Sequence, residues 1–81
     1  MTDFEVEEKW TLDSQALLVG KKVVDVRYMT EAEAEESMWY SRPIIIVFDD
    51  GTYLIPMADD EGNNGGSLFT SCVTMPVVPV L

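Results

Sequence analysis

The chain has 81 residues, which allows one small domain, and a chain of this size buries only about 60–65% of its unfolded surface and folds with little margin. Hydrophobic residues make up 47% of the sequence, which excludes a disordered acidic tail. The formal net charge of −10 argues against direct binding to nucleic acid or to an anionic membrane, because both require a basic surface. We expect a single globular domain over residues 1–81, as a monomer or weak dimer.

The N-terminal ten residues are acidic and lack a basic region followed by an apolar core, so no signal peptide is predicted. Uncharged apolar runs such as residues 43–48 are too short to span a membrane. A single cysteine, Cys72, excludes an internal disulfide framework, and its apolar context favours a buried structural thiol. These features predict a cytoplasmic protein.

The N-terminal segment has two interpretations. Phe4 and Val6 alternate with acidic residues, so residues 1–12 form either a short strand or a flexible arm. Trp10 is expected to be a core or capping residue. Residues 13–20 favour one or two helical turns, because Asp13 or Ser14 can cap the start and Gly20 can end it.

Residues 23–29 alternate in hydrophobicity and predict a half-buried strand, with Asp25 and Arg27 as a weak surface ion pair. Thr30 followed by Glu33 is a capping box, which predicts a short helix over residues 31–38. We interpret the glutamates of this helix as a solvated face.

Residues 44–57 contain the clearest structural signal, two apolar runs around Asp50-Gly51. A two-residue Asp-Gly loop favours a type I′ turn, which would place Phe48 opposite Tyr53 in the hairpin. Both faces of residues 44–48 are apolar, so this strand should be central in the sheet.

The sequence therefore predicts an α+β fold. We expect a small, mainly antiparallel curled sheet or partly closed barrel of four to five strands with one short helix; a flat sheet crossed by the helix is the alternative. Residues 70–74 form a candidate short strand. The apolar tail near residues 77–81 contains Pro79 and should pair at a sheet edge.

Trp39, Tyr40 and Arg42 lie in the connection between the predicted helix and the central strand. These residue types dominate binding hot spots, so the segment is a candidate recognition surface. The alternative is that Trp39 packs over the sheet edge with Arg42 stacked on it.

The loop of residues 58–67 is acidic and rich in glycine, and Asp59, Asp60, Glu61 and Asn63 make it the second candidate binding segment. Crowded oxygen ligands suit Ca²⁺, but an EF-hand alignment fails because Gly62 stands at the third position. The alternative is a turn whose Asp and Asn side chains bond their own backbone, and we assign no metal ligand.

Little in the chain predicts catalysis. It has no histidine, no glycine-rich loop in a phosphate-binding pattern, and one cysteine without an activating partner. We therefore expect no catalytic residue and no cofactor, and a protein that is not an enzyme.

Several segments together resemble a set of small uncharacterised bacterial proteins. They are VRYMT at residues 26–30, Trp39 with Arg42-Pro43, DDGTYLIP at residues 49–56, DDEGNNGG at residues 59–66 and the proline-valine-leucine ending. The resemblance covers most of residues 17–81. It implies a compact cytoplasmic domain and carries no known activity or site residue.

Three functions remain open from the sequence. The first is a non-catalytic interaction or regulatory domain that binds an unidentified protein partner through residues 39–42 and the acidic loop. The second is an acidic inhibitor that mimics nucleic acid and binds a basic protein. The third is a Ca²⁺-binding module formed by residues 59–66.

Overall fold

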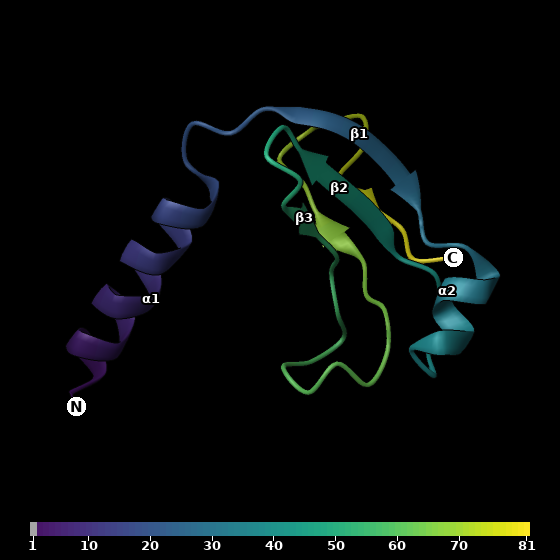
Figure 1. Ribbon diagram of the computed structural model, residues 1–81, viewed down its shortest axis with the longest axis horizontal. Coiled ribbons are helices and arrows are strands. Elements are labelled where there is room, and N and C mark those ends of the chain that lie inside the picture. The colour runs from purple at the N-terminus through teal and green to yellow at the C-terminus, as the bar shows by residue number, and fades with distance from the viewer. Residues whose placement is uncertain (1) are drawn as a thin grey trace.

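The computed structural model describes residues 2–81, which form an α+β fold with antiparallel strands (Figure 1). The predicted fold class is therefore confirmed. The main sheet has the order β1-β2-β3, so the strand at residues 44–48 is central, as predicted. The elements in chain order are α1 (Asp3–Leu18), β1 (Val23–Tyr28), α2 (Glu31–Glu36), β2 (Ile44–Phe48), β3 (Tyr53–Leu54), β4 (Leu68–Phe69) and β5 (Val77–Val78).

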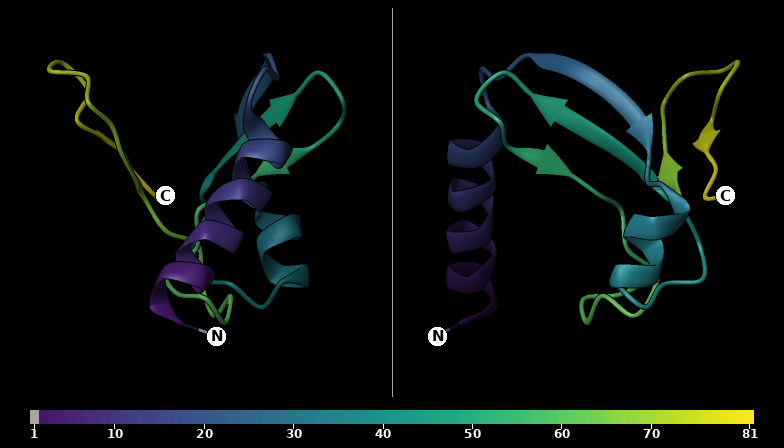
Figure 2. Two further views of the ribbon diagram at one scale, coloured as in Figure 1. Left: turned by 90° about the vertical axis from the view of Figure 1, so that its left-hand side faces the viewer. Right: turned by 45° about the vertical axis from the view of Figure 1, so that its right-hand side comes forward.

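The main sheet is open, and the partly closed barrel is not formed. The apolar tail does not join the main sheet; β5 pairs instead with β4 in a separate two-stranded sheet that stands away from it (Figure 2). Pro76 and Pro79 flank β5 and lack N–H donors, which limits its pairing to a short ladder. Residues 70–74 form no strand and make the turn between β4 and β5.

The N-terminal segment forms a sixteen-residue helix, α1, so the short strand predicted within residues 1–12 is wrong, and the helix predicted over residues 13–20 begins much earlier. Residue 1 of that segment lies outside the described residues. Thr2 caps it by accepting a hydrogen bond from the Glu5 N–H at 3.2 Å. Asp3 and Glu5 in the first turn stabilise the helix, because their negative charges lie near the positive end of the helix dipole. The sequence signal was Thr2 with Glu5 three residues later, the same spacing that correctly predicted the start of α2.

Helix α2 begins with the predicted capping box but ends at Glu36, two residues earlier than expected. The chain reverses at Met38, which has a φ of 59°. The Met38 N–H donates to the Glu35 carbonyl at 3.0 Å, and the Trp39 N–H donates to the Ala34 carbonyl at 2.8 Å. This is a Schellman motif, and it directs Trp39 back onto the helix that it follows.

The β2–β3 hairpin differs from the prediction by one residue in register. Val47 pairs with Tyr53, and the Phe48 N–H donates to the Thr52 carbonyl at 2.8 Å. The connection is therefore a three-residue loop of residues 49–51, and the type I′ turn is wrong. Only Gly51 in this loop has a positive φ, +89°.

Asp50 explains the longer loop. Its carboxylate accepts the Thr52 N–H at 2.9 Å and pairs with the Lys21 ammonium at 2.5 Å. The Lys21 contact is the main cause of a pKa of about 2 for Asp50. These contacts hold Asp50 in an ordinary conformation, and the left-handed residue is Gly51, as in three-residue hairpin loops.

The core is small and lies where α2 meets one end of the main sheet (Figure 1). The buried hydrophobic side chains are those of Met29, Ala34, Ile44 and Ile45, and Pro43 is fully buried. Met29, Ala34 and Ile45 form one cluster, and Trp39, Val47 and Ile55 pack against it from its margin. The core therefore fixes the segment that leads from α2 into β2, which is the segment of the first candidate site.

Candidate functional site

The structure joins the two segments that the sequence singled out. The Trp39 indole N–H donates to the Gly62 carbonyl at 2.7 Å. The side-chain oxygen of Asn64 accepts the backbone N–H groups of Tyr40 and Ser41 at 3.2 Å and 3.0 Å. Residues 39–42 and residues 58–66 therefore form one surface, which we call the two-loop platform.

Trp39 is held within this platform. Its ring is half-buried against the core, as the packing interpretation predicted. Among residues 2–81 the cation–π contact is that of Lys9 over Trp10, at 4.3 Å from the ring centroid, so the predicted stacking of Arg42 on Trp39 is wrong. Arg42 instead pairs its backbone with Leu81, with N···O distances of 2.7 Å and 2.9 Å. This pairing docks the C-terminal tail beside the platform.

Tyr40 is the exposed side chain of the platform. Its side chain is 97% accessible, although Asn64 holds its backbone. A shallow depression of about 380 Å³ adjoins it. The acidic and basic side chains in the lining of this depression are Glu31, Glu35 and Arg42. The platform thus presents an exposed aromatic ring, on a backbone that Asn64 holds, beside charged groups.

In the acidic loop Asp59 bonds its own neighbours. One carboxylate oxygen accepts the backbone N–H groups of Glu61 and Asn63 at 3.0 Å and 3.3 Å, and the other accepts the Asn63 amide at 2.9 Å. The bond from the Asn63 side chain is the main reason why the pKa of Asp59 is lowered. Asp60 and Glu61 are exposed. Among the described residues, no three acidic, histidine or cysteine side chains are grouped as a metal site requires.

The glycines of this loop are needed for close packing. A Cβ atom on Gly65 would lie 2.6 Å from Cδ of Pro43, and one on Gly66 would lie 2.9 Å from the Met57 carbonyl oxygen. Gly62 has a φ of +71°, a conformation that favours glycine. The glycine-rich composition suggested a flexible loop that could bind a cation. In the structure the same glycines allow the loop to pack tightly.

Asn64 is the residue that the sequence analysis missed. It accepts three backbone N–H groups, those of Tyr40, Ser41 and Gly65, whereas the predicted Asn63 bonds only within its own loop. Neither residue type nor spacing distinguishes the two adjacent asparagines, because two of the three partners of Asn64, Ser41 and Tyr40, lie 23 and 24 residues away in the sequence.

A second hollow lies between α2 and the main sheet, with a volume of about 370 Å³. Arg27 closes one wall with two bonds to Glu33, at 2.8 Å and 3.0 Å, and this contact lowers the pKa of Glu33 to about 2. The predicted pair of Arg27 with Asp25 is not formed; Asp25 accepts the Val26 N–H. We call this hollow the sheet groove; its lining residues are Arg27, Met29, Glu33, Glu36, Ser37, Ile45, Val47, Tyr53 and Ile55.

Cys72 is exposed in the turn between β4 and β5, so the expectation of a buried thiol is wrong. Its sulfur lies 3.3 Å from the hydroxyl of Thr74, and this contact is the main cause of a lowered thiol pKa.

Comparison of the chain with protein-family models, with curated proteins and with solved structures finds no match. Neither helix in residues 2–81 has the length and apolar character needed to cross a membrane.

Proposed function

We propose that the protein is a non-catalytic interaction domain that binds a partner protein through the two-loop platform. One observation carries this proposal: the Tyr40 side chain is 97% exposed on a backbone that Asn64 holds in place. A tyrosine side chain has only two rotatable angles, so it loses little conformational freedom on binding, and tyrosine is common among binding hot spots.

The surroundings of Tyr40 indicate the chemistry of the partner. Glu31 and Glu35 flank the depression beside the ring, and Asp60 and Glu61 are exposed on the acidic loop. A matching surface would offer an apolar pocket for the ring and basic side chains at its rim, which would also speed encounter with a chain of net charge −10. We place this interaction in the cytoplasm, a proposal that rests on the single cysteine.

An acidic mimic of nucleic acid is the second candidate, supported by the same carboxylates and by the net charge. This binding would depend on charge and little on Tyr40. The Ca²⁺ alternative has less support, because the Asp59 carboxylate already accepts three hydrogen bonds within its loop.

The test is quantitative capture of partners from lysate at low and high salt with three proteins: the unaltered chain, Tyr40→Ala and Phe69→Ala. Phe69 is a matched control because it is exposed on β4, in the separate two-stranded sheet. We expect a partner that the unaltered chain and Phe69→Ala retain and that Tyr40→Ala retains at least about tenfold less. Partners that bind all three proteins equally and are lost at high salt would favour the nucleic-acid mimic instead.

A further inference from the structure

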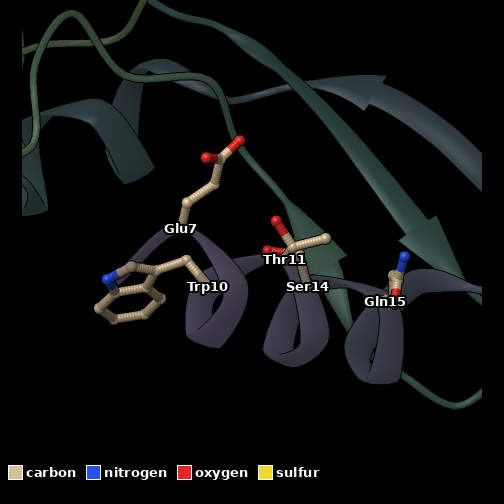
Figure 3. Close-up of a pocket in the computed structure, with 5 residues that line it drawn as sticks. All are labelled: Glu7, Trp10, Thr11, Ser14 and Gln15. Carbon is tan, nitrogen blue, oxygen red and sulfur yellow. The ribbon is translucent and has the colours of Figure 1, made fainter. Parts of the chain in front are cut away.

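Helix α1 is not covered by the rest of residues 2–81. None of its residues is buried, and in the described part of the chain its hydrogen bonds stay within the helix and its caps. Figure 1 shows it as a separate arm, and Figure 3 shows Trp10 among the five side chains of α1 that line a shallow hollow. An isolated helix of this length is marginal in water, so a covering surface would stabilise it.

The apolar side chains of α1 are large and exposed. Trp10 is 61% accessible, and the other exposed large apolar residues of the helix are Phe4, Val6, Leu12 and Leu17. Trp10 and Leu17 lie on one side of the helix, seven residues apart, with Val6 one turn before Trp10. They form a ridge, which is the shape that an apolar groove accepts.

The sheet groove is the complementary surface on the same molecule. Its floor consists of Met29, Ile45, Val47 and Ile55, and the side chain of Tyr53 at its margin is exposed. Arg27 and Glu33 supply a paired polar wall. The groove thus combines an apolar floor with a polar rim, as protein-binding surfaces do.

The chain exposes more surface than a monomer of its mass. Its accessible area is 6,208 Å², whereas a folded monomer of 9.1 kDa exposes about 4,900 Å². The excess is about 1,300 Å² per chain, or about 2,600 Å² for two chains, which is within the range buried by obligate homodimers. Association of two copies could therefore bury an area equal to this excess.

The ridge of α1 does not lie in the groove of its own chain. The linker between α1 and β1 is fixed to the hairpin, because Lys21 pairs with Asp50 and the Lys22 carbonyl accepts the Asp49 N–H at 2.9 Å. Helix α2, which forms one wall of the groove, lies at the other end of the main sheet from α1 (Figures 1 and 2).

We propose that two copies of the chain form a symmetric dimer in which α1 of each copy occupies the sheet groove of the other, with Trp10 as the anchor. The contact is made twice, as two-fold symmetry requires. The dimer goes beyond the proposed function, and its contacts use residues outside the two-loop platform. Because each chain carries a net charge of −10, added salt should tighten this dimer, whereas it would weaken binding of a basic partner.

Sedimentation equilibrium over a range of chain concentrations, at low and high salt, tests the dimer. We expect the mass of two chains at high concentration, with a dissociation constant that falls as salt rises. A chain that stays monomeric at all concentrations would overturn the proposal. In a ¹⁵N–¹H spectrum the Trp10 indole signal should shift with concentration, and the Trp39 indole signal, bonded to Gly62, should not.

Two variants test which surfaces meet. Trp10→Ala on the ridge and Tyr53→Glu at the groove should each raise the dissociation constant at least about tenfold, the second because a carboxylate would face the acidic helix α1, and Phe69→Ala should leave it unchanged. An equimolar mixture of the two variants should associate more strongly than either alone, because both changes then fall in one contact of the mixed dimer and the other ridge-to-groove contact stays intact. If Trp10→Ala weakens the dimer and Tyr53→Glu does not, α1 meets another surface and the proposal is wrong.

Discussion

Helix α1 and the two-loop platform are ordered by different kinds of contact. The helix has regular backbone bonds and a capped start, yet none of its residues is buried. The platform has almost no regular structure, yet bonds from Trp39 and Asn64 tie its two segments together. Regular secondary structure and tertiary anchoring are therefore separate properties, and in this chain they belong to different regions.

The difference shows where a substitution should matter. A change in the platform removes contacts between segments that are far apart in the sequence, so it should affect the whole fold. A change in α1 removes contacts only within one helix, so it should leave the folding of a single chain nearly unaltered. Four substitutions, from the largest expected effect to the smallest, measure this contrast.

Gly65→Ala should have the largest effect, lowering the free energy of unfolding by about 3 kcal/mol. Its Cβ atom would lie 2.6 Å from the ring of Pro43, which is fully buried. Gly20→Ala is the control: its Cβ atom meets nothing within 4 Å, so only the strain of a positive φ remains, about 1 kcal/mol. Urea unfolding measures both; equal losses would mean that close packing at Gly65 is unimportant.

Asn64→Ala should lower the free energy of unfolding by about 2 kcal/mol, because three backbone N–H groups lose their acceptor. Asn63→Ala is the matched control and should cost less than about 1 kcal/mol, since the bonds of Asn63 are exposed and lie within one loop. A greater loss at Asn63 than at Asn64, in the same urea experiment, would contradict the role given to Asn64.

Met38→Gly should stabilise the chain by about 0.5–1 kcal/mol. Met38 has a φ of 59° at the end of α2, where glycine is the favoured residue, and its side chain is 85% exposed and so loses few contacts. Thermal unfolding followed by circular dichroism measures the change. A lower melting temperature would show that Met38 makes contacts that its exposure does not reveal.

Trp10→Ala should have the smallest effect on a single chain, less than about 0.5 kcal/mol, because Trp10 is exposed on α1. The measurement must be made at a concentration where the chain is monomeric, since the proposed dimer would add its own stabilisation. A loss above 1 kcal/mol in the monomer would mean that Trp10 packs against its own chain.

Local signals in the sequence predicted the fold class and most of the elements. The Thr30–Glu33 capping box gave the start of α2, and the apolar run at residues 44–48 gave the central strand. The hairpin register was wrong because Asp50 pairs with Lys21, 29 positions earlier. The sequence does not show which distant side chain a turn residue will meet, and that contact selected the longer loop.

The candidate site was predicted as two separate segments, and both belong to one surface. Their composition identified Tyr40 and the acidic loop as candidates, but it did not predict the hydrogen bonds that join the two segments. Asn64 and Asn63 are adjacent and chemically identical, and only the folded chain brings one of them to Tyr40 and Ser41. The sheet groove escaped the sequence analysis for the same reason, since its walls come from α2 and three strands.

Residue-resolved amide hydrogen exchange at a concentration where the chain is monomeric tests the central claim most directly. We predict that the amides of Ser41, Ala58 and Gly66, whose acceptors lie 23, six and ten positions away in the sequence, exchange slowly, as amides of the main sheet do. The amides of α1 should exchange much faster, despite its regular helical bonds. Fast exchange throughout the platform together with strong protection of α1 in the monomer would contradict the account.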